Sequence, residues 1–216
     1  MQQKSFGKLP PVSVLTLGGG GLGMVWGETT FDECVATVHS AVGAGINWID
    51  LAPRYGDGKA ELVVGEAFAG RLPEGVRVTS KCNLGNPPSA DIEPLVRQSI
   101  EGSLERLRLS RLDLFFLHSN VVPDADHMAR RPDAASRMTL YATFVDRVRP
   151  LFERLVAEGL IGADRDRSPR YHHQVARRAP GPVGSAVHRQ FIGFAWRAEV
   201  LRRAGETARG HGRGAG

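Results

Sequence analysis

Residues 45–61 read GINWIDLAPRYGDGKAE, and this stretch decides the predicted fold. The apolar run INWIDLA, residues 46–52, is typical of a buried strand, and it carries Asp50 near its end. A glycine-rich loop with Tyr55 follows, and AELVVGEAFAG, residues 60–70, then predicts a short helix. A buried strand, a loop and a helix in this order make one βα unit.

The same unit recurs along the chain. The predicted strands are continuous apolar runs, at residues 12–17, 46–52, 76–81 and 112–119. Four helices are predicted. The first begins at the capping pair Thr30 and Glu33, and the second covers residues 60–70. The third begins at a cap at Ser89, and the fourth runs through Phe144 to Gly159. The glycine-rich residues 18–23 and the polar residues 120–137 are expected to be loops. Four such repeats predict a parallel sheet covered by helices.

Composition excludes several classes of protein. Hydrophobic residues make up 42% of the 216 residues, which is enough for a packed core. No apolar run approaches the roughly 18 residues of a membrane span, and the N-terminus lacks the apolar centre of a signal peptide. Cys34 and Cys82 are too few for a disulfide scaffold and lack metal-ligand spacing. We therefore expect a cytoplasmic protein without a membrane partner and without a metal site.

Ionisable or hydrogen-bonding residues occur at the ends of three predicted strands. Asp50 ends the second strand with Tyr55 just beyond it, Lys81 ends the third, and His118 ends the fourth. In a (β/α)8 barrel, active sites are built at the C-terminal ends of the strands, from several different strands. The alternative for each residue alone is a turn former or a solvated side chain. Four such groups in three consecutive units favour one shared site.

The chemistry of these four side chains is coherent. A phenol gives up its proton reluctantly at neutral pH, and a neighbouring ammonium such as Lys81 favours the phenolate. Asp50 would keep Lys81 charged and oriented. His118 would hydrogen-bond the oxygen that receives the proton. A proton donor suited to an alkoxide indicates reduction of a carbonyl, with the hydride supplied by a cofactor.

These motifs resemble those of the aldo-keto reductase family. GINWIDLAPRYGDGKAE, VTSK and LDLFFLHS occur in the family's order and at suitable spacing, and GKLPPVSVLTLGGGGLGMVWG resembles its N-terminal hairpin and first strand. The resemblance covers about residues 5–163. It implies a (β/α)8 TIM-barrel fold and NADP-dependent reduction of an aldehyde or ketone, or the reverse oxidation of an alcohol or sugar.

The resemblance also implies roles for individual residues. Tyr55 would be the proton donor, Lys81 its tuner, Asp50 the ion-pair partner and His118 the orienting group. Asp50 would also lie near the nicotinamide ribose. The remaining implied residues follow the first strand: Gly23 and Met24 near the NADP cofactor, and Trp26 at the edge of the substrate pocket.

A dinucleotide-binding Rossmann fold is the main alternative. Gly18, Gly20 and Gly23 spell G-x-G-x-x-G after a strand, and Asp50 ends the next strand. In that fold the third glycine opens the helix, whereas here the segment MVWGE precedes the cap at Thr30. The Rossmann fold also gives no role to Tyr55. We therefore expect the barrel.

The resemblance stops at Ala163, where the sequence changes character. Residues 1–163 carry a net charge of −2, whereas residues 164–216 carry +7, with 11 arginines and no lysine. Alanine, glycine, proline and arginine make up 30 of the last 53 residues. We expect a barrel domain at residues 1–163 and a disordered tail at residues 164–216, translated from a shifted frame of a GC-rich gene.

This boundary affects the expected function. A closed barrel needs about 250 residues and eight strands, so we expect an incomplete barrel of about four βα units. In the resembled family, the second half carries much of the groove for the adenosine phosphates, so weak cofactor binding and doubtful activity are expected. The alternative function is that of an inactive remnant whose basic tail binds nucleic acid through its phosphates.

Overall fold

The computed structural model describes residues 1–6, 9–129 and 133–162. The predicted tail at residues 164–216 lies outside the described residues, and so do the disorder, the shifted frame and the nucleic-acid binding expected of it. Within the described ranges, no helix is both long enough and apolar enough to cross a membrane.

The chain begins with an antiparallel hairpin of β1 (Gln3–Phe6) and β2 (Leu9–Ser13). The single strand predicted over residues 12–17 is wrong. The hydroxyl of Ser13 donates to the carbonyl oxygen of Leu15 (2.6 Å), the chain bends there, and the next strand, β3, spans only Leu17–Gly18. Local bonds from serine side chains compete with strand pairing, and an apolar pattern does not reveal them.

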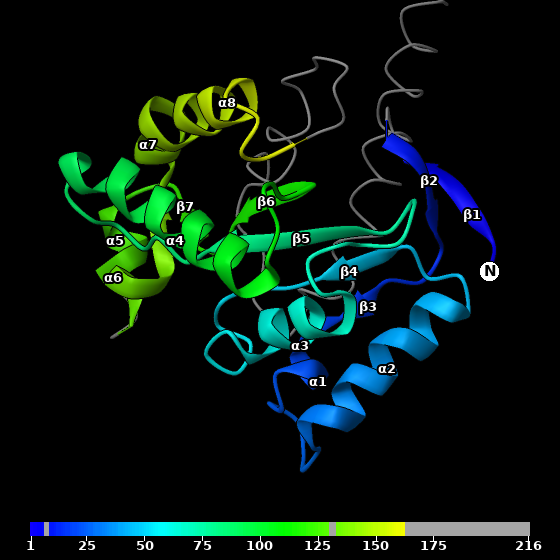
Figure 1. The fold of residues 1–216 in the computed structure, drawn as a ribbon. Coiled ribbons are helices and arrows are strands. Elements are labelled where there is room, and N and C mark those ends of the chain that lie inside the picture. Colours follow the sequence, from blue (N-terminus) through cyan, green and yellow to red (C-terminus); the bar gives the residue numbers. More distant parts are fainter. Residues whose placement is uncertain (7–8, 130–132, 163–216) are drawn as a thin grey trace, which may run out of the picture. The chain divides into compact units, whose positions relative to one another are not determined.

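A four-stranded parallel sheet lies at the centre of the described part of the chain (Figure 1). Its strands lie side by side in chain order: β3, β4 (Trp48–Asp50), β5 (Arg77–Cys82) and β6 (Leu114–Leu117). Each pairs in parallel with the strand before it. This is the order of a (β/α)8 barrel, as predicted, whereas a Rossmann sheet has its first strand inside the sheet. The strand order therefore excludes the Rossmann alternative.

The helices between these strands are α1 (Gly19–Leu22), α2 (Phe31–Gly43), α3 (Lys59–Phe68) and α4 (Ile92–Leu107). The capping box predicted for α2 is confirmed, because the Glu33 N–H donates to the Thr30 hydroxyl and the Thr30 N–H donates to the Glu33 carboxylate. The cap predicted at Ser89 is wrong, since Ser89–Asp91 forms a 3₁₀ turn before α4. The loop predicted at residues 18–23 contains the short helix α1.

The two faces of the sheet carry different residues. Ser80 of β5 faces the helices, because its hydroxyl bonds side chains of α3 and α4. Phe115, its partner in register on β6, faces them too and packs against Phe152 at 5.6 Å between ring centroids. Strand side chains alternate, so the opposite face carries Asp50 and Lys81. Asp50 and Lys81 therefore lie on the face of the sheet away from Ser80 and its helix partners.

The segment between β6 and the last helices is structured, although it was predicted to be a loop. β7 (Asn120–Val122) pairs in parallel with β8 (Met138–Leu140), and the helices α5 (Ala125–Ala129) and α6 (Ala134–Arg137) lie between them. The loop after β5 fixes this segment, because the Gly85 N–H donates to the Ser119 hydroxyl (2.8 Å) and the Thr139 hydroxyl donates to the Gly85 carbonyl. Such partners are distant in sequence, so local polarity gave the wrong prediction.

The last predicted helix is confirmed as three consecutive helical pieces, α7 (Tyr141–Thr143), a π-helix (Phe144–Val148) and α8 (Arg149–Ala157). Its predicted apolar stripe is buried: Phe144, Val148, Leu151, Phe152 and Leu155. Pro150 lacks an N–H and cannot continue a regular α-helical ladder, which accounts for the wider turn before it. After α8, Ile161 forms a parallel bridge with Leu112, among the residues just before β6, where a fifth strand of a barrel would begin.

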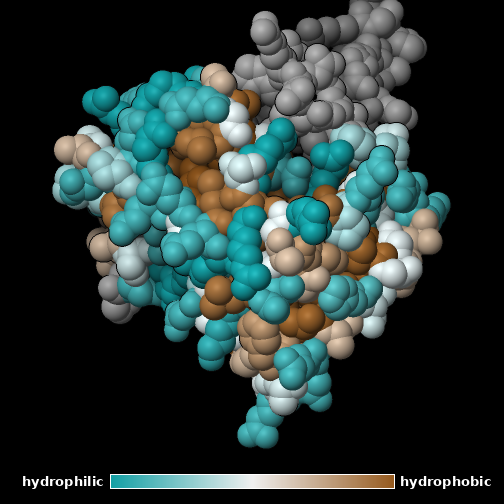
Figure 2. All heavy atoms as spheres, viewed as in Figure 1, coloured by the Kyte–Doolittle hydropathy of each residue, from teal (hydrophilic) through white to brown (hydrophobic). Residues whose placement is uncertain are grey.

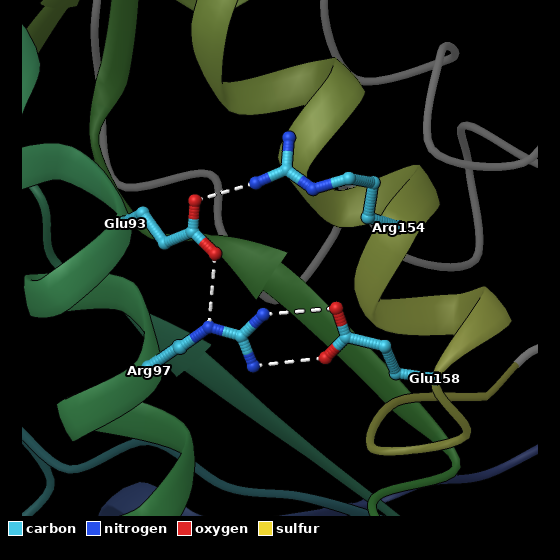
Figure 3. Close-up of polar contacts among 4 residues, drawn as sticks. All are labelled: Glu93, Arg97, Arg154 and Glu158. Atoms are coloured by element: carbon cyan, nitrogen blue, oxygen red, sulfur yellow. Dashed lines mark hydrogen bonds and ion pairs between the residues drawn. The ribbon is translucent and has the colours of Figure 1, made fainter.

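Four charged residues join α4 to α8 (Figure 3). Arg97 donates to both carboxylate oxygens of Glu158 (2.8 and 2.9 Å) and to Glu93 (3.0 Å), and Arg154 also donates to Glu93. These bonds lower the pKa of Glu93 and of Glu158 below the ordinary value.

Hydrophilic residues dominate the face seen in Figure 2, with hydrophobic residues in smaller areas between them.

Candidate active site

The four predicted site residues lie at the C-terminal end of the sheet. Asp50 is the last residue of β4, Lys81 is the next to last of β5, and His118 directly follows β6. Tyr55 lies in the loop between β4 and α3. In register, Asp50 is paired with Thr79, which is two residues before Lys81 and on the same face of the sheet. The parallel register therefore brings side chains from three strands to one end.

Lys81 is the centre of the group. Its Nζ lies 2.8 Å from Oδ1 of Asp50 and donates to the Tyr55 hydroxyl oxygen (3.1 Å) and to the carbonyl oxygen of Leu51 (2.8 Å). These three acceptors match the three N–H groups of an ammonium. Because Tyr55 accepts the bond from Lys81, the phenol's own proton remains available to another acceptor.

The ion pair is enclosed by protein. Lys81 is 5% exposed and Asp50 is 8% exposed. The hydroxyl of Thr79 donates to Oδ1 of Asp50 (2.8 Å) and so satisfies the carboxylate further. Thr79 was not among the predicted residues, although its position two residues before Lys81 on the same strand could have indicated it. A buried ion pair with additional hydrogen bonds has a fixed geometry, which suits the support of a reacting group.

His118 lies edge-on to Tyr55, with ring centroids 5.9 Å apart and planes at 88°. Burial lowers the pKa of His118 to about 4, and the charges of Lys81 and Arg54 act in the same direction against that of Asp50. The imidazole is therefore uncharged at neutral pH. Its Nδ1 is buried and has no hydrogen-bond partner among the described residues.

Two glycines allow the Tyr55 loop to approach the loop after β3. A Cβ on Gly23 would lie 2.5 Å from the carbonyl oxygen of Tyr55, and one on Gly56 would lie 2.0 Å from the carbonyl oxygen of Gly23. Gly56 also has φ of +66°, in the left-handed region that favours glycine. The backbone contact between these loops fixes the position of Tyr55 relative to the sheet.

The other three predicted residues follow α1. Gly23 ends α1 and contacts the Tyr55 backbone, as described above. Met24 has φ of +57°, and Trp26 is 72% exposed, with its ring packed over Gly20. These residues lie at the same end of the sheet as the four-residue group, because the backbone of Gly23 contacts that of Tyr55.

The described ranges were expected to contain no metal site, and their two cysteines are both free. No cluster of three histidine, cysteine or acidic side chains suited to a metal ion occurs there. Cys34 and Cys82 are both buried and unpaired. Burial raises the pKa of Cys82 to about 11, so it remains a thiol at neutral pH.

The described strands form a parallel sheet in the order of a (β/α)8 barrel, with this four-residue group at its C-terminal end. Residues 14–163 match the model of the aldo/keto reductase family, and the chain belongs to that family. This confirms the resemblance found in the motifs.

Individual relatives match part of their own length. The chain is 36% identical over 109 residues to L-galactose dehydrogenase of Arabidopsis thaliana, covering 50% of this chain and 34% of that protein. It is 30% identical over 118 residues to an NADH-specific methylglyoxal reductase of Escherichia coli, covering 48% of this chain and 36% of that protein. The chain thus spans about a third of the length of these relatives.

Solved structures give the same result. A glycerol dehydrogenase from Gluconobacter oxydans matches with a TM-score of 0.52 at 29% identity, covering 70% of this chain and 43% of that chain. An aldo-keto reductase from Klebsiella pneumoniae, solved in complex with NADPH, matches with a TM-score of 0.50 at 29% identity, covering 74% of this chain and 48% of that chain. The described residues therefore have the fold of part of a (β/α)8 TIM barrel.

Proposed function

We propose that this protein transfers a hydride between a nicotinamide cofactor and a small carbonyl compound, with Tyr55 as the proton donor. One observation carries the proposal: Nζ of Lys81 lies 3.1 Å from the Tyr55 hydroxyl oxygen and 2.8 Å from the carboxylate of Asp50. A phenol held against an ammonium suits the donation of a proton to an alkoxide.

In the proposed mechanism, each side chain acts on one atom. Tyr55 donates its hydroxyl proton to the carbonyl oxygen of the substrate, and Lys81 stabilises the phenolate that remains. Asp50 keeps the Lys81 ammonium in place through the ion pair. The neutral imidazole of His118 forms a hydrogen bond that orients the substrate oxygen. In the reverse direction the phenolate accepts the proton of an alcohol.

The described residues fit the reactive end of a nicotinamide cofactor. When bound, NADPH would supply the hydride. Asp50 would hold the nicotinamide ribose, and the backbone at Gly23 and Met24 would lie near the cofactor. The buried, unpartnered Nδ1 of His118 supports a bound molecule at this place. We propose NADP because the Klebsiella pneumoniae relative was solved with NADPH, although the Escherichia coli relative is named NADH-specific.

The proposed substrates are small aldehydes, ketones or, in reverse, sugars and other alcohols. The names of the relatives support this class, since they include an L-galactose dehydrogenase and a methylglyoxal reductase. Trp26, 72% exposed at the same end of the sheet, would edge the substrate pocket. We also propose that the barrel domain comprises residues 1–163 and that the tail, residues 164–216, takes no part in the chemistry.

A spectrophotometric assay with NADPH and methylglyoxal tests the proposal. We expect Tyr55→Phe to lower kcat by about 100-fold or more, because the ring remains and the transferable proton is lost. The matched control is Tyr141→Phe, since Tyr141 lies on α7 and is 47% exposed. Equal loss in both variants, or no turnover by the wild-type chain with methylglyoxal, simple aldehydes or galactose, would contradict the proposal.

A further inference from the structure

A buried carboxylate lies behind the candidate active site, on the helix-facing side of the sheet. Glu61 of α3 is 0% exposed. Its Oε1 accepts a hydrogen bond from the Ser80 hydroxyl of β5 (2.5 Å), and its Oε2 accepts one from Nε of Arg106 on α4 (2.7 Å). The Ser103 hydroxyl of α4 lies 3.2 Å from that of Ser80. One carboxylate thus joins two helices and a strand.

Glu61 is linked closely to Tyr55 along the chain. The carbonyl oxygen of Tyr55 accepts the backbone N–H of Ala60, in the first turn of α3 (3.3 Å). The Glu61 N–H in turn donates to the carbonyl of Gly58, the residue before α3 (3.1 Å). A displacement of the first turn of α3 would therefore carry the Tyr55 loop with it.

Glu61 is linked equally closely to Lys81. Ser80, its hydrogen-bond partner, immediately precedes Lys81 on β5, and the two side chains point to opposite faces of the strand. The bond from Ser80 to Glu61 therefore ties the helix that follows Tyr55 to the backbone that carries Lys81. One end of this hydrogen-bonded link is next to Tyr55, and the other is next to Lys81, whose Nζ lies 3.1 Å from the Tyr55 hydroxyl oxygen.

Apolar packing alone would not need this arrangement. Ala60, Val63 and Val64 already bury the face of α3, with 0 to 1% exposure. Apolar contacts are non-directional and let a helix settle in several positions, whereas satisfied buried polar networks specify one position. A buried carboxylate is costly unless it is fully bonded, and Glu61 is bonded at both oxygens.

We propose that Glu61 is a positioning residue, which sets the distance between the Tyr55 hydroxyl and the Lys81 ammonium through its bond to Ser80. Its effect on turnover rests on the proposed function, whereas its effect on the geometry of the site does not. Glu61 is buried on the helix-facing side of the sheet, so it would touch neither substrate nor cofactor. It acts through the positions of α3 and β5.

The test uses two substitutions and a matched control in the 216-residue chain. Glu61→Gln keeps the shape and removes the charge, and the milder Ser80→Ala removes only the hydroxyl between helix and strand. The control is Glu66→Gln, because Glu66 also joins α3 to the end of α4, through Arg108, but lies exposed at the surface. Circular dichroism and thermal unfolding establish that each variant is folded.

The first readout is turnover. With NADPH and methylglyoxal we expect Glu61→Gln and Ser80→Ala to lower kcat about tenfold or more with KM changed less than about twofold, since a small misplacement of a reacting group reduces the rate of the chemical step. Glu66→Gln should match the wild type. A folded Ser80→Ala variant with unchanged kcat would overturn the proposal, even if Glu61→Gln does not fold.

The second readout does not require activity. His118 is identified among the seven histidines by comparing NMR spectra with those of His118→Gln. We expect its titration midpoint to rise by about one pH unit in Ser80→Ala, because displacement of β5 moves the Lys81 charge and opens the site to water. If the wild-type chain lacks turnover, the proposed function fails but this measurement still decides the role of Glu61. An unchanged midpoint would overturn it.

Discussion

Lys81 shows how one residue organises the site. Its ammonium has three acceptors, and one of them, the Tyr55 hydroxyl, is the proposed proton donor. The other two, Asp50 and the Leu51 carbonyl, fix its direction. The phenol therefore meets a cation of defined position instead of a mobile surface lysine.

His118 gives the residue-scale prediction. Its pKa is about 4 in the folded chain, against an ordinary value of 6.5. Between these two pH values the imidazole is therefore protonated in the unfolded chain and neutral in the folded chain. Above pH 6.5 the imidazole is neutral in both states and does not lower the free energy of unfolding. As the pH is lowered from 6.5 to 4, the unfolded chain takes up the proton and the free energy of unfolding decreases. We expect a loss of about 2 kcal/mol over this interval, reduced for the partial exposure of the ring.

Urea denaturation at several pH values measures this loss. His118→Gln should flatten the dependence of the free energy of unfolding on pH between pH 6.5 and 4, measured against the wild type in the same buffers. Identical slopes in wild type and His118→Gln would show that another group is responsible.

Sequence reasoning found the four residues of the group because each interrupts an apolar pattern at the same end of a predicted strand. Thr79 and Glu61 were missed for different reasons. Threonine is common in strands, so Thr79 does not stand out in the sequence. Its position two residues before Lys81, which puts both side chains on one face of the strand, is the signal that could have identified it. Glu61 has the appearance of a surface acid in the first turn of a helix, and only the packing of α3, α4 and β5 shows its burial.

At the scale of elements, α4 and α8 are joined by charged side chains. Arg97 reaches across to Glu158 with two bonds, and Glu93 receives bonds from both helices (Figure 3). The lowered pKa values of Glu93 and Glu158 mean that this stabilisation is present above their ordinary value and is lost as the pH falls through the lowered one. Because the groups are exposed, salt weakens the network.

Arg97→Met gives the element-scale prediction. We expect amide hydrogen exchange in α8 to become several-fold faster at low salt, because the helix loses its charged link to α4 while its apolar stripe remains. The control is Arg147→Met, since Arg147 is exposed and forms no ion pair within the described ranges. The difference between the two variants should shrink in 1 M salt, and a difference that persists would contradict an electrostatic origin.

Elements were predictable where their determinants are local. The capping box at Thr30 and the apolar stripe of the last helix are read directly from spacing. The split of residues 12–17 and the β7–β8 pair were not, because the Ser13 hydroxyl and the loop at Gly85 decide them. A side-chain bond or a distant partner overrides the local pattern in both places.

At the scale of the whole molecule, the described sheet contains four parallel strands and the first bridge of a fifth, Leu112 with Ile161. The order of these strands was predictable from four repeats of one unit. The matched relatives are about three times as long as the part they share with this chain. A barrel of eight strands gathers residues around its mouth from both halves.

Cofactor affinity gives the prediction at this scale. We expect the 216-residue chain to bind NADPH at least about tenfold more weakly than the Klebsiella pneumoniae relative, because the described sheet has four strands, whereas ligand sites of a full barrel use loops after strands of both halves. Fluorescence titration of both proteins in one buffer measures this, with Asp50→Asn of this chain as a control for binding at the site. Equal affinities would contradict the expectation.

The contacts of Lys81 have a consequence for biosynthesis. They join residues only 26 to 31 positions apart, within the first half of the chain. Loops of that length close early, and N-terminal segments fold first while a protein is made on the ribosome. We therefore expect the nascent polypeptide to acquire its ammonium–phenol pair during translation, before the α8 helix has left the exit tunnel.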